Sequence, residues 1–262
     1  MSRSFLLATS VLALAPSAHA LDRFEIQVYD GQTNVPGVLS LENHVNLIGQ
    51  GARTSPGPEL PTNHQLHWTF EGALGATGVW EPGIYVQTAL LPDGTVAFGG
   101  MKLRSKFTAA PLLGGRLRLA ANLELADVPR RFEQDQWSVE VRPIAALAVG
   151  PWRIALNPIL GVPLTSGASE NGPHFEPAAS VKGLLSEHAA LGVEYYGDFG
   201  PILAPEPAIE QQHYLFAAGD YDLGRGVALN VGIGGGIAGQ TDALVAKVVV
   251  GFELARLWGS RE

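Results

Sequence analysis

The sequence contains no cysteine. This absence excludes disulfide bonds, thiolate metal sites and a cysteine nucleophile, and no lipobox cysteine can follow a leader. Charged residues are also scarce, at 16% of the chain, and 25 acidic residues outnumber 17 basic ones, for a formal net charge of −8 at pH 7. Because nucleic acid attracts positively charged surfaces, this balance argues against nucleic acid as a partner.

Long hydrophobic runs are missing as well. After residue 20 no stretch of 18 apolar residues occurs, so the sequence predicts no transmembrane helix. Yet 46% of the residues are hydrophobic, and 32 glycines and 18 prolines are too many for a helical protein of this length. The chain therefore has to arrange its apolar residues in β-sheet.

The first twenty residues have the layout of a secretory signal peptide. Arg3 supplies a positive charge, residues 5–15 are apolar, and Ala18-His19-Ala20 is a small-x-small cleavage site. The apolar run is too short to span a bilayer as a helix. We expect cleavage to leave a mature chain that begins at Leu21.

Strict alternation of apolar and polar residues dominates the rest of the chain. Leu39 and Leu41, for example, alternate with Ser40 and Glu42. A period of two is typical of strands with two different faces, and lengths of about 10–14 residues suit tilted membrane strands. Twelve segments follow this pattern: Val38–Gly49, Gln65–Ala76, Val79–Leu91, Met101–Phe107, Arg116–Ala126, Trp137–Val149, Trp152–Val162, Phe175–Leu185, Ala189–Phe199, His213–Leu223, Val227–Ile237 and Leu244–Leu254.

The connections between these segments alternate in length. Tight turns such as Thr77-Gly78 and Gly150-Pro151 alternate with longer polar loops such as Ala52–Asn63 and Pro201–Glu210. Outer-membrane barrels have short periplasmic turns and longer external loops. The sequence therefore predicts an all-β fold, a closed antiparallel transmembrane β-barrel of twelve strands over residues 38–258, with a short C-terminal tail at 259–262.

Residues 21–37 raise the question of the strand count. Arg23–Asp30 alternates too, but counting it would give thirteen strands, whereas bacterial barrels have an even number. We therefore predict that residues 21–37 form an N-terminal segment that lies in the periplasm or is tucked into the lumen. A fourteen-strand barrel that uses Arg23–Asp30 is the alternative.

Charges gather on one face of the predicted strands. Because a lysine or arginine that faces lipid at mid-membrane costs about 2–4 kcal/mol, this face must line the lumen. We predict a basic patch there, made of Lys102, Arg104, Lys106, Arg116, Arg118 and Arg142. We also predict an acidic wall, made of Glu42, Glu71, Glu81, Glu194, Asp198, Asp220 and Asp222. Either the two form a transverse field, with the basic patch attracting anions at a constriction, or their ion pairs fill and close the lumen.

His44 and His67 are predicted to face the lumen from adjacent strands. A hydrolase would need a serine nucleophile beside such a base, and the nearest serine, Ser40, belongs to no recognisable motif. Together with Glu71 the two histidines would offer three metal ligands, but such mixed clusters are common in polar lumens. We expect hydrogen-bonded lumen histidines, with no catalytic residue, no metal site and no cofactor.

Several strings of the mature chain resemble a poorly characterised family of proteobacterial outer-membrane barrels. They are Phe24–Asp30, Val141-Arg142-Pro143-Ile144, Asn157-Pro158-Ile159-Leu160, Phe175-Glu176-Pro177-Ala178, Gly192–Gly200 and Gln211-Gln212-His213. Members of this family are often labelled as transporters or grouped with barrels of phenol-degradation operons. The resemblance implies the outer membrane of a Gram-negative bacterium and a transporter-like role, without naming a solute.

The leading hypothesis is thus an outer-membrane channel or facilitator for a small solute. Its expected partners are outer-membrane lipids, the barrel-assembly machinery and the solute itself. A structural barrel with a plugged lumen is the alternative, and an outer-membrane lipid hydrolase is the third hypothesis.

Overall fold

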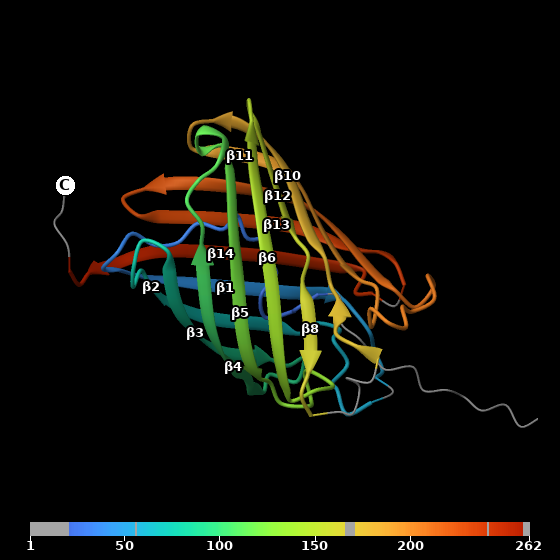
Figure 1. Cartoon of the computed structure of the whole chain (residues 1–262). Coiled ribbons are helices and arrows are strands. Elements are labelled where there is room, and N and C mark those ends of the chain that lie inside the picture. The colour runs from blue at the N-terminus through green and yellow to red at the C-terminus, as the bar shows by residue number, and fades with distance from the viewer. Residues whose placement is uncertain (1–20, 56, 166–170, 240, 259–262) are drawn as a thin grey trace, which may run out of the picture.

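Twelve antiparallel strands close into a barrel in the computed structural model, which describes residues 21–55, 57–165, 171–239 and 241–258 (Figure 1). The ring consists of β1 (Val38–Gln50), β2 (Leu66–Leu74), β3 (Trp80–Leu90), β4 (Val96–Thr108), β5 (Leu117–Asp127), β6 (Trp137–Val149), β7 (Trp152–Asn157), β10 (Ala178–Ser186), β11 (Ala189–Asp198), β12 (Gln212–Gly224), β13 (Val227–Ala238) and β14 (Leu244–Arg256). It closes where β1 pairs with β14, with Leu47 opposite Ala246. The predicted twelve-strand closed barrel is confirmed.

Little of the described chain is helical. A short 3₁₀ turn, η1 (Leu113–Gly115), lies between β4 and β5. In the part of the chain that the structure describes, no helix is long and apolar enough to cross a membrane. The predicted signal peptide, residues 1–20, and the predicted tail, residues 259–262, lie outside the described residues.

The period-two pattern separates the two faces of the wall. Leu103 and Leu156 point outward and are 57% and 50% exposed, whereas Arg104 and Glu71 point inward and are 5% and 2% exposed. The outer face carries many such large apolar side chains. A monomeric soluble protein rarely exposes so broad an apolar surface, so this face suits lipid.

Two short strands, β8 (Leu160–Pro163) and β9 (His174–Phe175), lie outside the ring of twelve. On β6, Ala145 pairs with Leu156 of β7 and Val141 pairs with Leu160 of β8, so β8 resumes the register of β7 after a gap. Proline supplies no N–H for a ladder, and the gap contains one proline from each side, Pro143 and Pro158. The single strand predicted over Trp152–Val162 is therefore divided.

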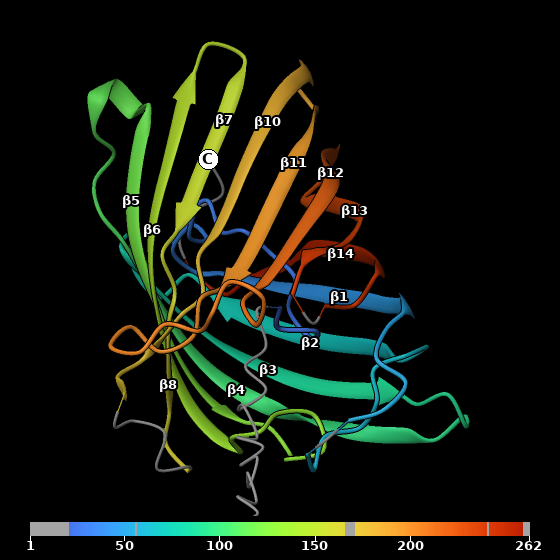
Figure 2. The ribbon, with the colours of Figure 1, turned by 90° about the vertical axis from the view of Figure 1, so that its right-hand side faces the viewer.

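The N-terminal segment, residues 21–37, runs through the inside of the barrel (Figure 2). Near its start Arg23 lies 3.0 Å from Asp242 in the β13–β14 loop, and at its end the Gly37 N–H donates to the Gly75 carbonyl in the β2–β3 turn. It therefore passes from the end with the longer loops to the end with the tight turns. Its residues form no strand of the wall, so the fourteen-strand alternative is wrong.

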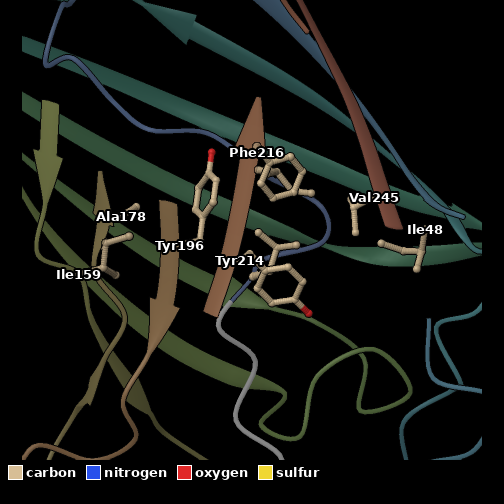
Figure 3. Close-up of a cluster of buried hydrophobic side chains, with 9 residues drawn as sticks. Ile48, Ile159, Ala178, Tyr196, Tyr214, Phe216 and Val245 are labelled. Carbon is tan, nitrogen blue, oxygen red and sulfur yellow. The ribbon is translucent and has the colours of Figure 1, made fainter. Parts of the chain in front are cut away.

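The segment packs against an apolar part of the lumen. Leu21 and Ile26 are buried in a cluster with wall residues that point inward, and Figure 3 shows seven of them: Ile48, Ile159, Ala178, Tyr196, Tyr214, Phe216 and Val245. A second cluster forms around Phe24 and includes Phe132 from the β5–β6 loop. The barrel thus has a packed core inside its lumen, and the N-terminal segment contributes to it.

Candidate functional site

Arg104 lies between two members of the acidic wall. Its Nη1 is 2.5 Å from Glu71 Oε1, and its Nη2 is 2.5 Å from Glu81 Oε1. Lys106, the next inward-facing residue of β4, has its Nζ 2.8 Å from the same Glu81 oxygen. Arg104, Glu71 and Glu81 are all buried. Acids of β2 and β3 therefore neutralise this part of the basic patch directly.

Lys102 is neutralised in part by the N-terminal segment. Its Nζ lies 2.5 Å from Asp22 Oδ2 and 3.3 Å from Glu25 Oε2, both in the segment, and 3.2 Å from Glu124 Oε2 on β5. The Asn122 amide donates to the other Glu124 oxygen at 2.7 Å. Two carboxylates that hold Lys102 thus come from residues outside the barrel wall, and release of the segment would remove both.

The remaining arginines of the basic patch lie in three different environments. Arg142 pairs with Glu140 of its own strand at 2.7 Å and donates to the Gln27 carbonyl at 3.4 Å. Arg118 is part-exposed and donates to the Asp30 carbonyl at 3.2 Å. Arg116 is exposed in the β4–β5 connection and contributes nothing to the lumen interior.

Arg116 lies in the β4–β5 turn, away from Lys106. The β4–β5 register places Asn122 opposite Lys106. The Ala109 N–H donates to the Leu119 carbonyl and Leu112 bridges Leu117, so the hairpin pairs as far as a turn at residues 113–116 that contains η1. The sequence alone does not fix this register, because its alternation is compatible with more than one turn position.

The acids on the other side of the barrel have lysine partners of their own. Glu194 Oε1 lies 2.7 Å from Lys182 Nζ, and its Oε2 forms an ion pair with Lys247. Lys182 also lies 2.7 Å from Asp220. Both lysines sit on the polar face of their strands, and this position is the signal by which sequence reasoning could have added them to the site.

The other acidic-wall residues differ in burial. Asp198 is buried at the loop end of β11. Glu42 is part-exposed near His44, and Asp222 is exposed at the turn end, 3.7 Å from His188. The acidic wall is therefore a set of local partners rather than one continuous charged surface.

The two lumen histidines have different surroundings. His44 Nε2 lies 3.3 Å from Glu71 Oε2, and its other ring nitrogen has no hydrogen-bond partner. Neither ring nitrogen of His67 makes a hydrogen bond, and its ring packs edge-on against Phe24 with 4.5 Å between centroids. Ser40 accepts a hydrogen bond from the Asn34 amide and donates one to the Ala73 carbonyl. No serine–histidine pair is therefore assembled among these residues.

Wall side chains satisfy the backbone of the N-terminal segment. Because the segment has no strand partner, its buried carbonyls need donors from elsewhere. The Asn157 side chain binds both backbone polar groups of Tyr29: it accepts from the Tyr29 N–H at 2.8 Å and donates to the Tyr29 carbonyl at 2.9 Å. Three further wall side chains donate to the carbonyls of Arg23, Phe24 and Ile26: Asn46 at 2.9 Å, Thr69 at 2.8 Å and Lys247 at 3.0 Å.

A cavity of about 340 Å³ remains at the loop end of the lumen. Asp22 of the N-terminal segment borders it, together with Lys102, Glu124, Glu140 of β6, which is paired with Glu124, and Glu176 between β9 and β10. Acidic residues outnumber basic ones in its lining. The cavity is large enough for a small solute, and the segment stands between it and the turn end of the barrel.

No family model and no curated protein matches the sequence. Among solved structures, the chain is similar to an outer-membrane channel from Pseudomonas putida F1, with 9% identity and a TM-score of 0.56 over 87% of this chain and 99% of that one. It is similar to the KdgM porin, with 8% identity and a TM-score of 0.53 over 82% and 99%. The NanC porin matches with 8% identity and a TM-score of 0.51 over 82% and 100%. The chain has the fold of these outer-membrane barrels.

Proposed function

We propose that this chain is an outer-membrane channel for a small solute and that its N-terminal segment closes the lumen at rest. The observation that carries the proposal is the way the segment is held. Side chains of an intact wall bind its backbone, so it can leave the lumen without breaking a strand pair. The similarity in fold to the KdgM and NanC porins adds support.

The paired charges suggest which ions would pass. Lys102, Arg104 and Lys106 each have acidic partners within 3.3 Å, so the basic patch has little charge left to attract an anion. The loop-end cavity, in contrast, has an excess of carboxylates. Because a cleft lined by one sign of charge concentrates counter-ions, we expect cations to be preferred over anions.

Single-channel recording in planar bilayers tests the proposal. The test variant replaces residues 24–33 with a Gly/Ser sequence of equal length, which keeps the chain length and the backbone carbonyls but removes the buried side chains of Phe24, Ile26 and Tyr29 that pack in the lumen. The wild type should open rarely and the variant should conduct persistently, with reversal potentials in a KCl gradient that indicate cation preference. Heat-modifiable migration on SDS gels serves as the control that both barrels are folded.

A structural barrel without transport is the second candidate, and the filled lumen favours it. Buried ion pairs, two apolar clusters and the N-terminal segment all lie in the interior. If neither the wild type nor the Gly/Ser variant conducts while both are folded, the structural role is correct and the channel proposal fails.

We also propose that residues 1–20 direct export and that the barrel resides in the outer membrane of a Gram-negative bacterium. The broad band of exposed apolar side chains supports lipid as a partner. Insertion of such a barrel would also engage the barrel-assembly machinery. The sequence resembles a family that is loosely grouped with the barrels of phenol-degradation operons, so phenol is the first organic solute to assay, by uptake into liposomes that contain the protein.

A further inference from the structure

Glu176 and Asp198 lie opposite each other in the barrel wall, outside the ion-pair networks described above. Ala178 of β10 pairs with Tyr196 of β11. Backbone hydrogen bonds from Gly197 to Pro177 and from Phe199 to Phe175, both 3.0 Å, continue that register toward the loop end. Glu176 and Asp198 therefore form a cross-strand pair between two bonded pairs, the geometry that brings side chains closest. Like charges in this position destabilise a sheet.

His174 adds a third group on the same face. It precedes Glu176 by two residues, and its Nδ1 lies 3.7 Å from Asp198 Oδ1. One potential ligand atom from each of the three residues lies within 4.8 Å of the other two. Donors that each bind a metal ion at roughly 2.0–2.2 Å have separations of this order.

These carboxylates differ from the other buried acids of the lumen in having no lysine or arginine at ion-pair distance. Glu71, Glu81, Glu124 and Glu194 each lie within 3.3 Å of a lysine or arginine nitrogen. Within the described residues, no lysine or arginine nitrogen is found within 4.0 Å of Glu176 or Asp198.

Asp198 supplies a second, independent observation. Although the residue is only 1% exposed, its Oδ2 has no hydrogen-bond partner, while its Oδ1 accepts from the Gly200 N–H at 2.7 Å. A buried carboxylate oxygen without a partner is unfavourable unless a cation or donor occupies the site. The register, the shared face and this oxygen bring two carboxylates without a lysine or arginine partner, and an imidazole, to one place in the barrel.

We propose that His174, Glu176 and Asp198 bind a divalent transition-metal ion at the loop end of the barrel. Two carboxylates balance its charge, and the imidazole nitrogen favours ions such as Zn²⁺ over Mg²⁺ and Ca²⁺, which prefer oxygen ligands. His174 and Glu176 line the loop-end cavity, so water or a solute can complete the coordination. Binding at this site does not depend on whether the barrel conducts.

The second cluster of this kind, Glu42, His44 and Glu71, does not carry the same proposal. There Arg104 already lies 2.5 Å from Glu71 and supplies the positive charge. A metal ion would have to displace or repel that guanidinium.

Calorimetric titration of Zn²⁺ into the full-length, chelator-treated and untagged protein in detergent tests the proposal. The wild type should bind one ion per barrel, and Glu176→Gln, Asp198→Asn and His174→Ala should each weaken binding by about 10-fold or more. His188→Ala is the matched control, because His188 Nδ1 also lies 3.7 Å from an aspartate oxygen, that of Asp222, without a third ligand. This variant should bind Zn²⁺ as the wild type does.

A wild type that binds no Zn²⁺, or ligand variants that bind as tightly as the wild type, would overturn the proposal. An equal loss in His188→Ala would do so too. Since a ligand variant can fail to fold, a second measurement uses the wild type alone. Co²⁺ added to the wild type should give the visible absorption of an ion bound by nitrogen and oxygen ligands. Excess Zn²⁺ should abolish this absorption, and excess Mg²⁺ should not. A spectrum identical to that of Co²⁺ in buffer would contradict the site.

Discussion

Replacement of Arg104 by methionine distinguishes a free basic patch from a paired one, because the two predict opposite signs. If Arg104 were an unpaired cation between Lys102 and Lys106, removing it would relieve repulsion and stabilise the barrel. The structure instead places its guanidinium 2.5 Å from both Glu71 and Glu81, with all three residues buried. The replacement leaves two buried carboxylates without that partner, so it should destabilise the barrel.

The magnitude follows from what remains around each acid. Breaking a buried ion pair typically costs about 3–5 kcal/mol. Lys106 stays 2.8 Å from Glu81, and His44 stays 3.3 Å from Glu71, so both acids keep one partner. We therefore expect a loss at the lower end, about 3 kcal/mol in the free energy of unfolding.

Urea titration of the barrel in micelles, followed by tryptophan fluorescence in both the unfolding and refolding directions, measures this loss. The triple variant Glu71→Gln, Glu81→Gln, Arg104→Met removes the charges together and should recover most of the stability, since replacing a whole buried ion cluster is often close to neutral. A single variant as stable as the wild type, or more stable, would refute the paired arrangement. A triple variant no better than the single one would show that the loss comes from packing.

Three further predictions concern the N-terminal segment and its contacts. Asn157→Ala removes two buried hydrogen bonds to Tyr29, worth about 2 kcal/mol, and should raise the ratio of open to closed channel by about 30-fold in bilayer recordings. Asn230→Ala, whose amide contacts only Glu194 and Asp220, should not change this ratio. Equal effects of the two variants would contradict a role for Asn157 in closure. Gly99→Ala places a Cβ against the Phe24 ring, 2.6 Å from its Cζ and closer still to Cε1, and should lower the free energy of unfolding by about 1–3 kcal/mol. Gly72→Ala, whose nearest neighbour is 3.9 Å away, should change it little. N-terminal sequencing of the envelope form should begin at Leu21, and an intact Met1 would contradict export by cleavage.

The strand pattern could be predicted because it is local. Each strand of the wall alternates along its own sequence, and lipid on one side with a polar lumen on the other enforces the same period everywhere. The interruption of Trp152–Val162 was also visible in the sequence, in Pro143 and Pro158, because proline cannot donate to a ladder. Only the structure shows that these two prolines lie opposite each other on neighbouring strands, because this depends on the register between the strands.

The ion partners could not be predicted in the same way. Which acid meets Arg104 depends on inter-strand register and side-chain reach, and the β4–β5 hairpin shows that the position of a turn sets the register of one strand against the next. Lys102 depends on Asp22 and Glu25, which approach from a segment far away in the sequence. One signal of that segment was available, because Tyr196, Tyr214 and Phe216 are large apolar or aromatic residues on the polar face and need a partner inside the lumen.

The way the N-terminal segment is bound bears on whether it can act as a gate. If the segment were paired as a strand, a continuous ladder of hydrogen bonds would hold it in the wall. Its release would then break the closed barrel. Asn46, Thr69, Asn157 and Lys247 bind it one carbonyl at a time, and each faces a lumen where water can replace the lost bond. Each of these bonds is therefore worth only about 1 kcal/mol net of its exchange with water. Release also exposes Leu21, Phe24 and Ile26, which are almost fully buried. At about 1.5–3 kcal/mol for each side chain, this apolar burial is sufficient to hold the segment in the lumen. In the channel proposed above, a solute with an apolar part that occupies the cluster around Tyr214 and Phe216 would offset the loss of this burial and so favour release of the segment.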